Sequence, residues 1–181
     1  IGANGVTSLF NSKNGHLLVG TFGGGLSIYN PDKDNFTTYK NIPGDSESLS
    51  NDNVIALFQD SLGLIWVGTE RGLNHFNEKT GKFKTYLYDS LDQSSISNDM
   101  VWAFYEDSNQ RLWIGTAGGS LNRWDAIDRK AAIANFHHYS ENISLPSSNI
   151  YGIKSDEAGV LWLSHNRGIT SLVPETLQTH Q

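Results

Sequence analysis

The sequence predicts an all-β protein of four similar units, and a β-propeller is the architecture that fits these units best. The 181 residues repeat at steps of 48, 47 and 49 residues, as the first apolar residue of each copy shows: Val6, Val54, Val101 and Ile150. Each copy contains four short apolar segments separated by polar turns, and no copy has helical periodicity. Four-stranded antiparallel units with a period of about 40–50 residues are typical of propeller blades.

The second copy shows the four expected strands, at residues 53–59, 64–69, 73–77 and 82–87. Residues 53–59 are apolar on both faces, which predicts a strand that is buried on both faces. An aspartate follows the first strand in the last three copies, and its carboxylate is expected to cap the turn. These residues are Asp60, Asp107 and Asp156, and the first copy has Ser12 in the same column.

Two columns of the repeat indicate how the blades pack. A large residue stands in the second strand of every copy: Leu18, Trp66, Trp113 and Trp162. Aromatic side chains mostly fill cores, so we expect this column to pack between neighbouring blades, with Trp113 between the second and third. One column of the first strand holds only small residues, as expected near the crowded axis: Ser8, Ala56, Ala103 and Gly152.

The chain is expected to form one propeller segment over residues 1–181, with blades at about 1–48, 49–95, 96–144 and 145–181. Phe83 and Tyr86 mark the outer strand of the second copy, and no counterpart of them follows Pro174. The fourth blade is therefore expected to be incomplete and to lack its outer strand. Ile1 stands in a column of connecting-loop residues, so we expect a fragment of a larger propeller. Open blade edges favour self-association. The expected contact residues come from the first and fourth blades: Val6, Leu9, Leu18, Leu161 and Trp162.

Composition excludes several classes of protein and site. The net charge of −6 does not suit a general nucleic-acid binder, which carries a basic patch. The chain has no cysteine, which excludes disulfides and thiol nucleophiles. It has no apolar run of about 18 residues, so this segment is not expected to contact a membrane. No cofactor is expected, because the glycines at 23–25 are followed by neither G-K-[ST] nor a helix.

The sequence predicts no catalytic site and no metal site. The motifs G-x-S-x-G and H-E-x-x-H are absent. The turn aspartates recur once per blade and would be spaced around a ring, whereas acid–base catalysis needs two groups at one bond. His137 and His138 are neighbours on a strand and therefore face opposite sides. Residues 32–35 resemble the start of a calcium loop but lack its glycine and its distal glutamate.

Candidate ligand-binding residues lie in the turns between second and third strands and at the start of first strands, which share one face in a propeller. Arg71 and Arg167 stand in such turns and offer planar donors suited to carboxylates. Trp102 and Tyr151 stand early in their first strands and are suited to stack on a sugar ring. Packing between blades and simple surface exposure are the alternatives for these four residues.

The pattern V-x-x-(L/F)-x-x-D-x-x-G-x-(L/I)-W-(I/V)-G-T-x-x-G-L-N-x-(F/W)-(N/D) resembles the two-component regulator propeller repeat. Residues 54–77 and 101–125 match it best, and the resemblance extends over nearly the whole chain. The first copy departs from it with Leu18 in place of Trp. The fourth copy departs at its middle turn, with Ser164 and His165 in place of Gly-Thr.

This resemblance implies a periplasmic sensor region of a bacterial membrane-anchored signalling protein. Such regions usually have more blades, often in two consecutive propellers, and the parent carries a histidine kinase or a diguanylate cyclase as its output. Known members respond to glycans or their breakdown products, so a glycan or another small ligand is the implied partner. The expected function is therefore a ligand- or partner-sensing module. The alternatives are a propeller enzyme, such as a polysaccharide lyase or glycosidase, and a structural spacer that holds two sensor chains together.

Overall fold

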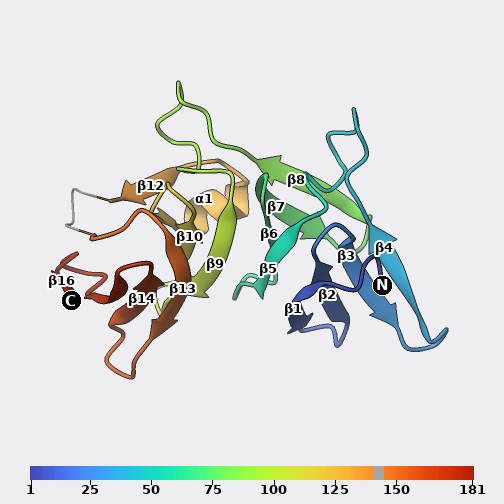
Figure 1. Cartoon of the computed structure of the whole chain (residues 1–181), viewed down its shortest axis with the longest axis horizontal. Helices are drawn as coiled ribbons and strands as arrows, with labels where there is room; N and C mark the ends of the chain where they lie inside the picture. The colour runs from blue at the N-terminus through green and yellow to red at the C-terminus, as the bar shows by residue number, and fades with distance from the viewer. Residues whose placement is uncertain (141–144) are drawn as a thin grey trace. The chain divides into compact units, whose positions relative to one another are not determined.

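The computed structural model describes residues 1–140 and 145–181, which form two compact units, Ile1–Tyr86 and Leu87–Gln181. Each unit contains two four-stranded antiparallel sheets, and in every sheet the strands follow one another in chain order (Figure 1). This arrangement confirms the all-β fold and the four blade-like repeats.

The first unit holds the first two blades. The first blade consists of β1 (Val6–Asn11), β2 (Leu17–Thr21), β3 (Gly25–Asn30) and β4 (Asn35–Tyr39). The second consists of β5 (Val54–Gln59), β6 (Ile65–Thr69), β7 (Gly72–Asn77) and β8 (Lys82–Tyr86), each within one residue of the expected bounds. The expectation that β5 is buried on both faces is wrong, because only Val54 is fully buried. As the edge strand of its sheet, β5 has fewer neighbours to cover its side chains.

The second unit holds the third and fourth blades. The third consists of β9 (Val101–Glu106), β10 (Leu112–Thr116), β11 (Leu121–Trp124) and β12 (Phe136–Tyr139). The fourth consists of β13 (Ile150–Ser155), β14 (Leu161–His165), β15 (Gly168–Leu172) and β16 (Thr179–His180). The expected loss of the outer strand is therefore wrong. The short β16 pairs with β15 through backbone bonds, which need no aromatic side chain.

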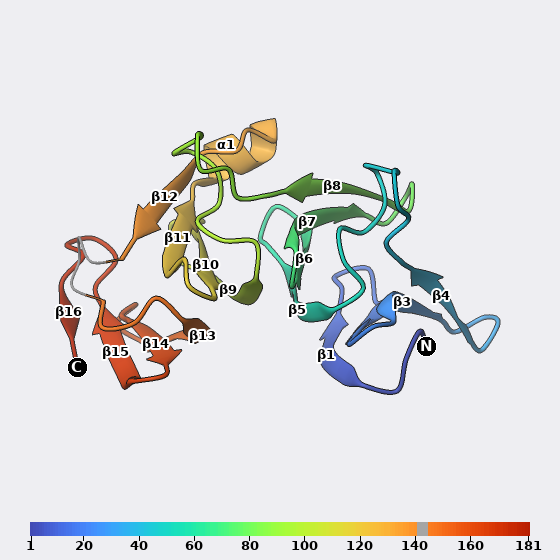
Figure 2. The same ribbon diagram turned by 45° about the horizontal axis from the view of Figure 1, so that its top comes forward.

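The third copy has an insertion between its third and fourth strands. A short helix, α1 (Ala126–Ala131), lies in this insertion, where the sequence predicts no helix. Figure 2 shows it in the connection that leads from β11 to β12. Six residues make fewer than two turns, so no helical periodicity can develop over them. The helix ends at Ala132, which adopts the left-handed conformation with φ of 53° and donates its N–H to the carbonyl of Arg129.

Each unit has its core between its two blades. In the first unit, side chains of both blades form one buried cluster: Leu18, Leu26, Leu49, Val54, Ile65, Val67, Phe76 and Phe83. In the second unit, Trp113 of the third blade packs with residues of the fourth, including Ile150 and Leu161. The expectation that Trp113 packs between the second and third blades is therefore wrong. Alternation along a strand predicts two faces but does not tell which face meets which neighbour.

The aspartate turns are confirmed, and each carboxylate has a second role. In the third blade, Oδ1 of Asp107 accepts the backbone N–H of Arg111 at 3.0 Å, and Oδ2 accepts the indole N–H of Trp113 at 2.8 Å. The same pair of bonds recurs at Asp60 and Asp156. In the first blade, Ser12 stands in place of the aspartate and Leu18 in place of the tryptophan. The serine hydroxyl still accepts a turn N–H at 3.2 Å.

Two of the five expected self-association residues lie in the core. Leu18 and Leu161 are fully buried, because they fill the space between the blades of their own unit. Three remain at the surface: Val6, Leu9 and Trp162 are 47%, 66% and 46% exposed.

Candidate functional site

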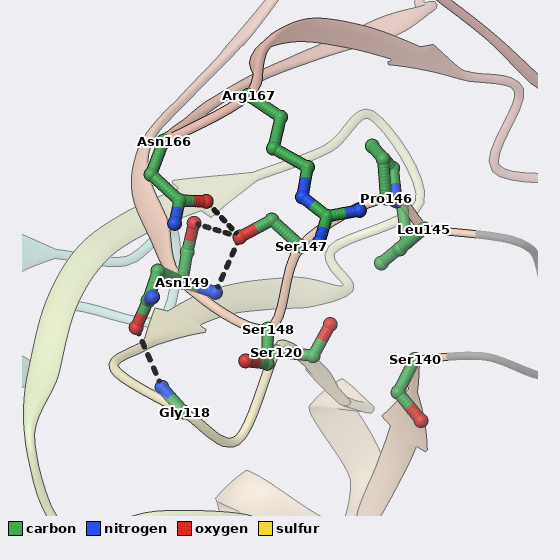
Figure 3. A pocket seen from close by; sticks show the side chains of 10 residues that line it. All are labelled: Gly118, Ser120, Ser140, Leu145, Pro146, Ser147, Ser148, Asn149, Asn166 and Arg167. Carbon is green, nitrogen blue, oxygen red and sulfur yellow. Dashed lines mark hydrogen bonds between the residues drawn. The ribbon is translucent and has the colours of Figure 1, made fainter.

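A cavity of about 550 Å³ lies between the third and fourth blades of the second unit (Figure 3). Its walls come from the β10–β11 turn, the loop before β13, the β14–β15 turn and the residue that follows β12. The lining residues are Gly118, Ser120, Ser140, Leu145, Pro146, Ser147, Ser148, Asn149, Asn166 and Arg167. A volume of this size is in the range of small-molecule sites.

Hydrogen bonds between the loops hold the wall of this pocket in place. The hydroxyl of Ser147 donates to Oδ1 of Asn166 at 2.6 Å and accepts the backbone N–H of Asn149 at 3.0 Å. The side chain of Asn149 in turn accepts the N–H of Gly118 at 2.9 Å (Figure 3). These bonds join three segments that are far apart in the sequence, and they hold this part of the wall together.

The β14–β15 turn is held by His165, which stands where the other blades have threonine. In the second blade, Oγ1 of Thr69 accepts the backbone N–H of Arg71 at 3.1 Å. In the fourth blade, Nδ1 of His165 accepts the N–H of Arg167 at 3.1 Å, and its Nε2 lies 2.9 Å from the Thr170 hydroxyl. Nδ1 must be unprotonated to accept, so the neutral ring carries its proton on Nε2. The sequence departure at Ser164 and His165 thus preserves the turn.

Arg167 carries the one charge among the lining residues that the structure describes. It is exposed at the end of the turn, and none of the described lining residues is an aspartate or glutamate. Within residues 1–140 and 145–181, Arg167 forms no ion pair with a carboxylate. Burial of His165, and secondly the charge of Arg167, hold the pKa of that histidine below its ordinary value. No carboxylate of these described residues therefore competes with a ligand for the guanidinium.

The structure brings together two of the four predicted site residues. The rings of Trp102 and Tyr151, from β9 and β13, lie 4.8 Å apart between centroids at an angle of 30°. They contact each other and do not line the pocket of Arg167. Tyr151 is 49% exposed, so this aromatic pair has an accessible surface. Arg71 belongs to the first unit, in the turn between β6 and β7, and is not among the residues that line the pocket.

Most of the polar lining of the pocket was not predicted from the sequence. Ser147, Asn149 and Asn166 carry no recognisable motif, and their convergence depends on loop geometry. Ser120 had a detectable signal, because glycine stands at the start of the third strand in the other copies.

Two further cavities differ from this pocket in having paired charges. One of about 410 Å³ in the second unit is lined by Asp107, Arg111 and Glu175 among others. There, Arg111 pairs with Asp107 at 2.6 Å and with Glu175 at 2.7 Å. One of about 350 Å³ in the first unit includes His16 and Glu78, whose side chains lie 3.0 Å apart. No group of three or more His, Asp or Glu residues in the described ranges is placed to hold a metal ion.

Comparison with known proteins identifies the repeats. Residues 48–71 and 95–118 match the family described as two component regulator propeller. The chain carries two-component regulator propeller repeats. Each match runs from the loop before a first strand, through the second strand, into the middle turn. A curated relative, Histidine kinase P4 of Formosa agariphila, is 40% identical over 58 residues, which are 32% of this chain and 4% of that protein.

Solved structures of other proteins share the fold. The extracellular domain of the hybrid two component system BT3049 from B. thetaiotaomicron matches 99% of this chain at 22% identity, with a TM-score of 0.81. That of BT4673, from the same organism, matches 98% at 21% identity, with a TM-score of 0.84. The chain spans only 24% and 25% of these two domains. A streptogramin B lyase structure matches 99% of the chain at 18% identity and a TM-score of 0.68.

The described residues contain no helix that is both long enough and apolar enough to cross a membrane.

Proposed function

We propose that this chain is a non-catalytic part of the extracytoplasmic sensing region of a bacterial membrane-anchored signalling protein. The match of residues 48–71 and 95–118 to the two-component regulator propeller carries the proposal. The extracellular domains of hybrid two component systems that share the fold support it. The output domain of the parent is a histidine kinase or a diguanylate cyclase, and the sensing region lies in the periplasm.

The proposed ligand site is the pocket between the third and fourth blades, and the proposed ligand is a glycan fragment or another small molecule. Hydrogen bonds join its loops, and Arg167 offers a cation without an ion-pair partner among the described residues. The aromatic pair of Trp102 and Tyr151 is a second candidate surface, suited to a sugar ring.

A binding screen of the purified chain tests this function. Thermal shift against a panel of soluble oligosaccharides, followed by calorimetry of the hits, should reveal a ligand whose affinity falls in Arg167→Met. Arg71→Met is the matched control, because it removes the same charge from the corresponding turn of the second blade. Turnover of a panel member that survives repurification would instead favour a propeller enzyme.

The signalling role has a separate test in membranes that contain the parent protein. The ligand found in the screen should change autophosphorylation or cyclase activity, and Arg167→Met should shift this response to higher ligand concentration. An output that is indifferent to the ligand would leave a binding module without a sensing role, and would contradict the proposal.

We also propose self-association of the isolated chain through the open faces of its first and fourth blades. The exposure of Trp162 supports it: this indole is 46% exposed, whereas Trp66 and Trp113 in the same column are at most 1% exposed. The occupant that we propose is a second copy of this chain, whose first blade exposes Val6 and Leu9.

A further inference from the structure

Ser120 occupies a position that the other three blades give to glycine. Gly25, Gly72 and Gly168 begin β3, β7 and β15 with φ of 77°, 120° and 119°. Ser120 directly precedes β11 with φ of 69°. This left-handed region favours glycine, because a Cβ crowds the backbone there. A side chain that persists in such a conformation points to a role for the side chain itself.

The hydroxyl of Ser120 does nothing for the fold that the structure records. The residue is 1% exposed, and its Oγ has no hydrogen-bond partner in the described part of the chain. Its backbone, by contrast, is fully engaged. The N–H donates to the carbonyl of Ser148 at 2.8 Å, and the carbonyl accepts from the Thr116 hydroxyl at 3.0 Å. Buried hydroxyl groups are seldom left without a partner, so this one indicates a missing acceptor or donor.

Ser120 and Arg167 line the same pocket, and Ser120 lies below Arg167 in the view of Figure 3. Among its described lining residues, the pocket thus combines a guanidinium that forms no ion pair with a hydroxyl that has no hydrogen-bond partner, and none of them is a carboxylate. The backbone N–H of Arg167 donates to His165, which fixes the point from which the arginine side chain extends. A guanidinium and a hydroxyl are both donors, and a planar guanidinium matches the oxygens of an oxyanion.

We propose that this pocket binds the singly charged oxyanion group of an acidic ligand, with Arg167 as its ion-pair partner and Ser120 Oγ as a hydrogen-bond donor. The inference rests on the proposed ligand-sensing function and specifies the class of ligand. A carboxylate and a sulfate ester share this chemistry. The ligand inserts its anionic group between the two blades, and the rest of it occupies the remaining volume.

Calorimetry with probes that differ only in charge tests the proposal. D-Glucuronate should bind, and D-glucuronamide, which has a similar shape without the charge, should bind more weakly by about 10-fold or more. D-Glucose 6-sulfate distinguishes a carboxylate ligand from a sulfate ester. Arg167→Met should lower the affinity for the tighter anion by about 10-fold or more, and Arg71→Met should leave it unchanged.

Ser120→Gly separates the binding role of the hydroxyl from any role in folding. Glycine is the repeat's own residue in this column and suits the positive φ, so the melting temperature should stay equal or rise. The affinity for the anion should fall by about 2- to 10-fold, as expected for the loss of one hydrogen bond. A lower melting temperature, or an unchanged affinity, would overturn the assignment of this hydroxyl to a ligand.

The outcomes also separate this inference from the proposed function. Equal affinity for glucuronate and glucuronamide, or an unchanged affinity in Arg167→Met, would overturn the anion site. A screen in which every oligosaccharide that binds is neutral would also overturn the anion site. In each of these cases the proposed sensing function would stand. If neither the screen nor the charged probes give binding, both proposals fall.

Discussion

His165 carries out in the fourth blade what Thr69 does in the second, since each accepts a backbone N–H of its turn, and it adds a titratable group to the turn. Its Nδ1 accepts the N–H of Arg167, which a protonated ring cannot do. The residue that positions the cation of the pocket is therefore sensitive to pH, whereas a threonine is not. The replacement of the repeat's threonine by His165 therefore makes the hydrogen bond that holds the Arg167 turn dependent on pH.

His165→Thr should make the stability of the protein less dependent on pH. The pKa of His165 is lowered in the folded state, first by burial and then by the charge of Arg167. Between the ordinary pKa near 6.5 and the lower folded value, the unfolded chain binds more protons, so stability is lost as the pH falls through this range. The melting temperature, measured from about pH 7.5 to 5.5, should therefore fall more steeply for the wild type than for His165→Thr.

His75 also has a lowered pKa, but it is present in both proteins and cancels in the comparison. Parallel curves for the two proteins would show that His165 is not coupled to folding.

Trp113→Ala should destabilise the second unit by about 3–5 kcal/mol, the usual cost of truncating a buried tryptophan. The indole is fully buried, packs with residues of the fourth blade, and donates to Asp107. Urea denaturation followed by circular dichroism measures the cost. Trp162→Ala is the matched control, because Trp162 donates to Asp156 in the same way but is 46% exposed.

The control should cost clearly less than Trp113→Ala when both are measured at a concentration where the chain is a single species. A cost below about 1 kcal/mol for Trp113→Ala would contradict its place in the core.

At the scale of single residues, the sequence predicts the roles of residues that recur from copy to copy of the repeat. The capping aspartates were predictable because they recur, and their bond to the indole is implied by the joint departure of Ser12 and Leu18. The blade against which Trp113 packs was not predictable, because periodicity does not identify the neighbour. The polar lining of the pocket was missed because Ser147 and Asn166 meet only through loop geometry.

At the scale of elements, α1 is attached to the third blade by a buried cation. The side chain of Arg129 is fully buried and donates to the carbonyls of Trp124 and Gln110 at 2.8 and 2.9 Å. Nη1 makes both of these bonds, and Nη2 donates to Oε1 of Glu106 on β9. The insertion of the third copy is thus anchored from a helix of six residues to the first strand of its own blade.

Arg129→Met should cost about 3–5 kcal/mol, because it removes the cation that faces the Glu106 carboxylate in a buried setting. Combining it with Glu106→Gln should recover part of this cost, since the buried negative charge disappears as well. A double-mutant cycle by urea denaturation measures the coupling. Strictly additive losses would show that the ion pair does not hold the helix.

Strands of this protein were more predictable than its helix and its last strand. Four turn-bounded apolar segments per repeat fixed β5 to β8 to within one residue. The helix α1 is too short for a periodic signal, and its position depends on Arg129, whose burial no sequence pattern reveals. The strand β16 has no aromatic signature and exists through backbone pairing with β15.

At the scale of the whole molecule, the repeat explains why an indole lies at the surface. Each inner copy of the tryptophan is covered: Trp66 is 1% exposed and Trp113 is fully buried. Trp113 is buried in a cluster that includes residues of the next blade in its unit, among them Ile150 and Leu161. Trp162 has the same bond to its turn aspartate but keeps an exposed face, which suits the first blade of another chain.

Self-association of the isolated chain should follow from this face. Light scattering at micromolar concentration should give about twice the chain mass of 20.0 kDa or more, because interfaces of standard size are stable there. Trp162→Lys and Leu9→Lys should each shift the chain toward the monomer, since a charge is costly to bury without a partner.

Leu91→Lys is the control for a general effect of added charge, because Leu91 is 93% exposed and lies in the loop between the second and third blades. It should leave the assembly intact. A contact between a fourth and a first blade joins two different surfaces, so it is heterologous and can continue from chain to chain. The measured mass should therefore rise with concentration beyond the dimer unless the contacts close into a ring. A monomer at all concentrations, or an assembly indifferent to both lysine variants, would contradict the contact between these faces.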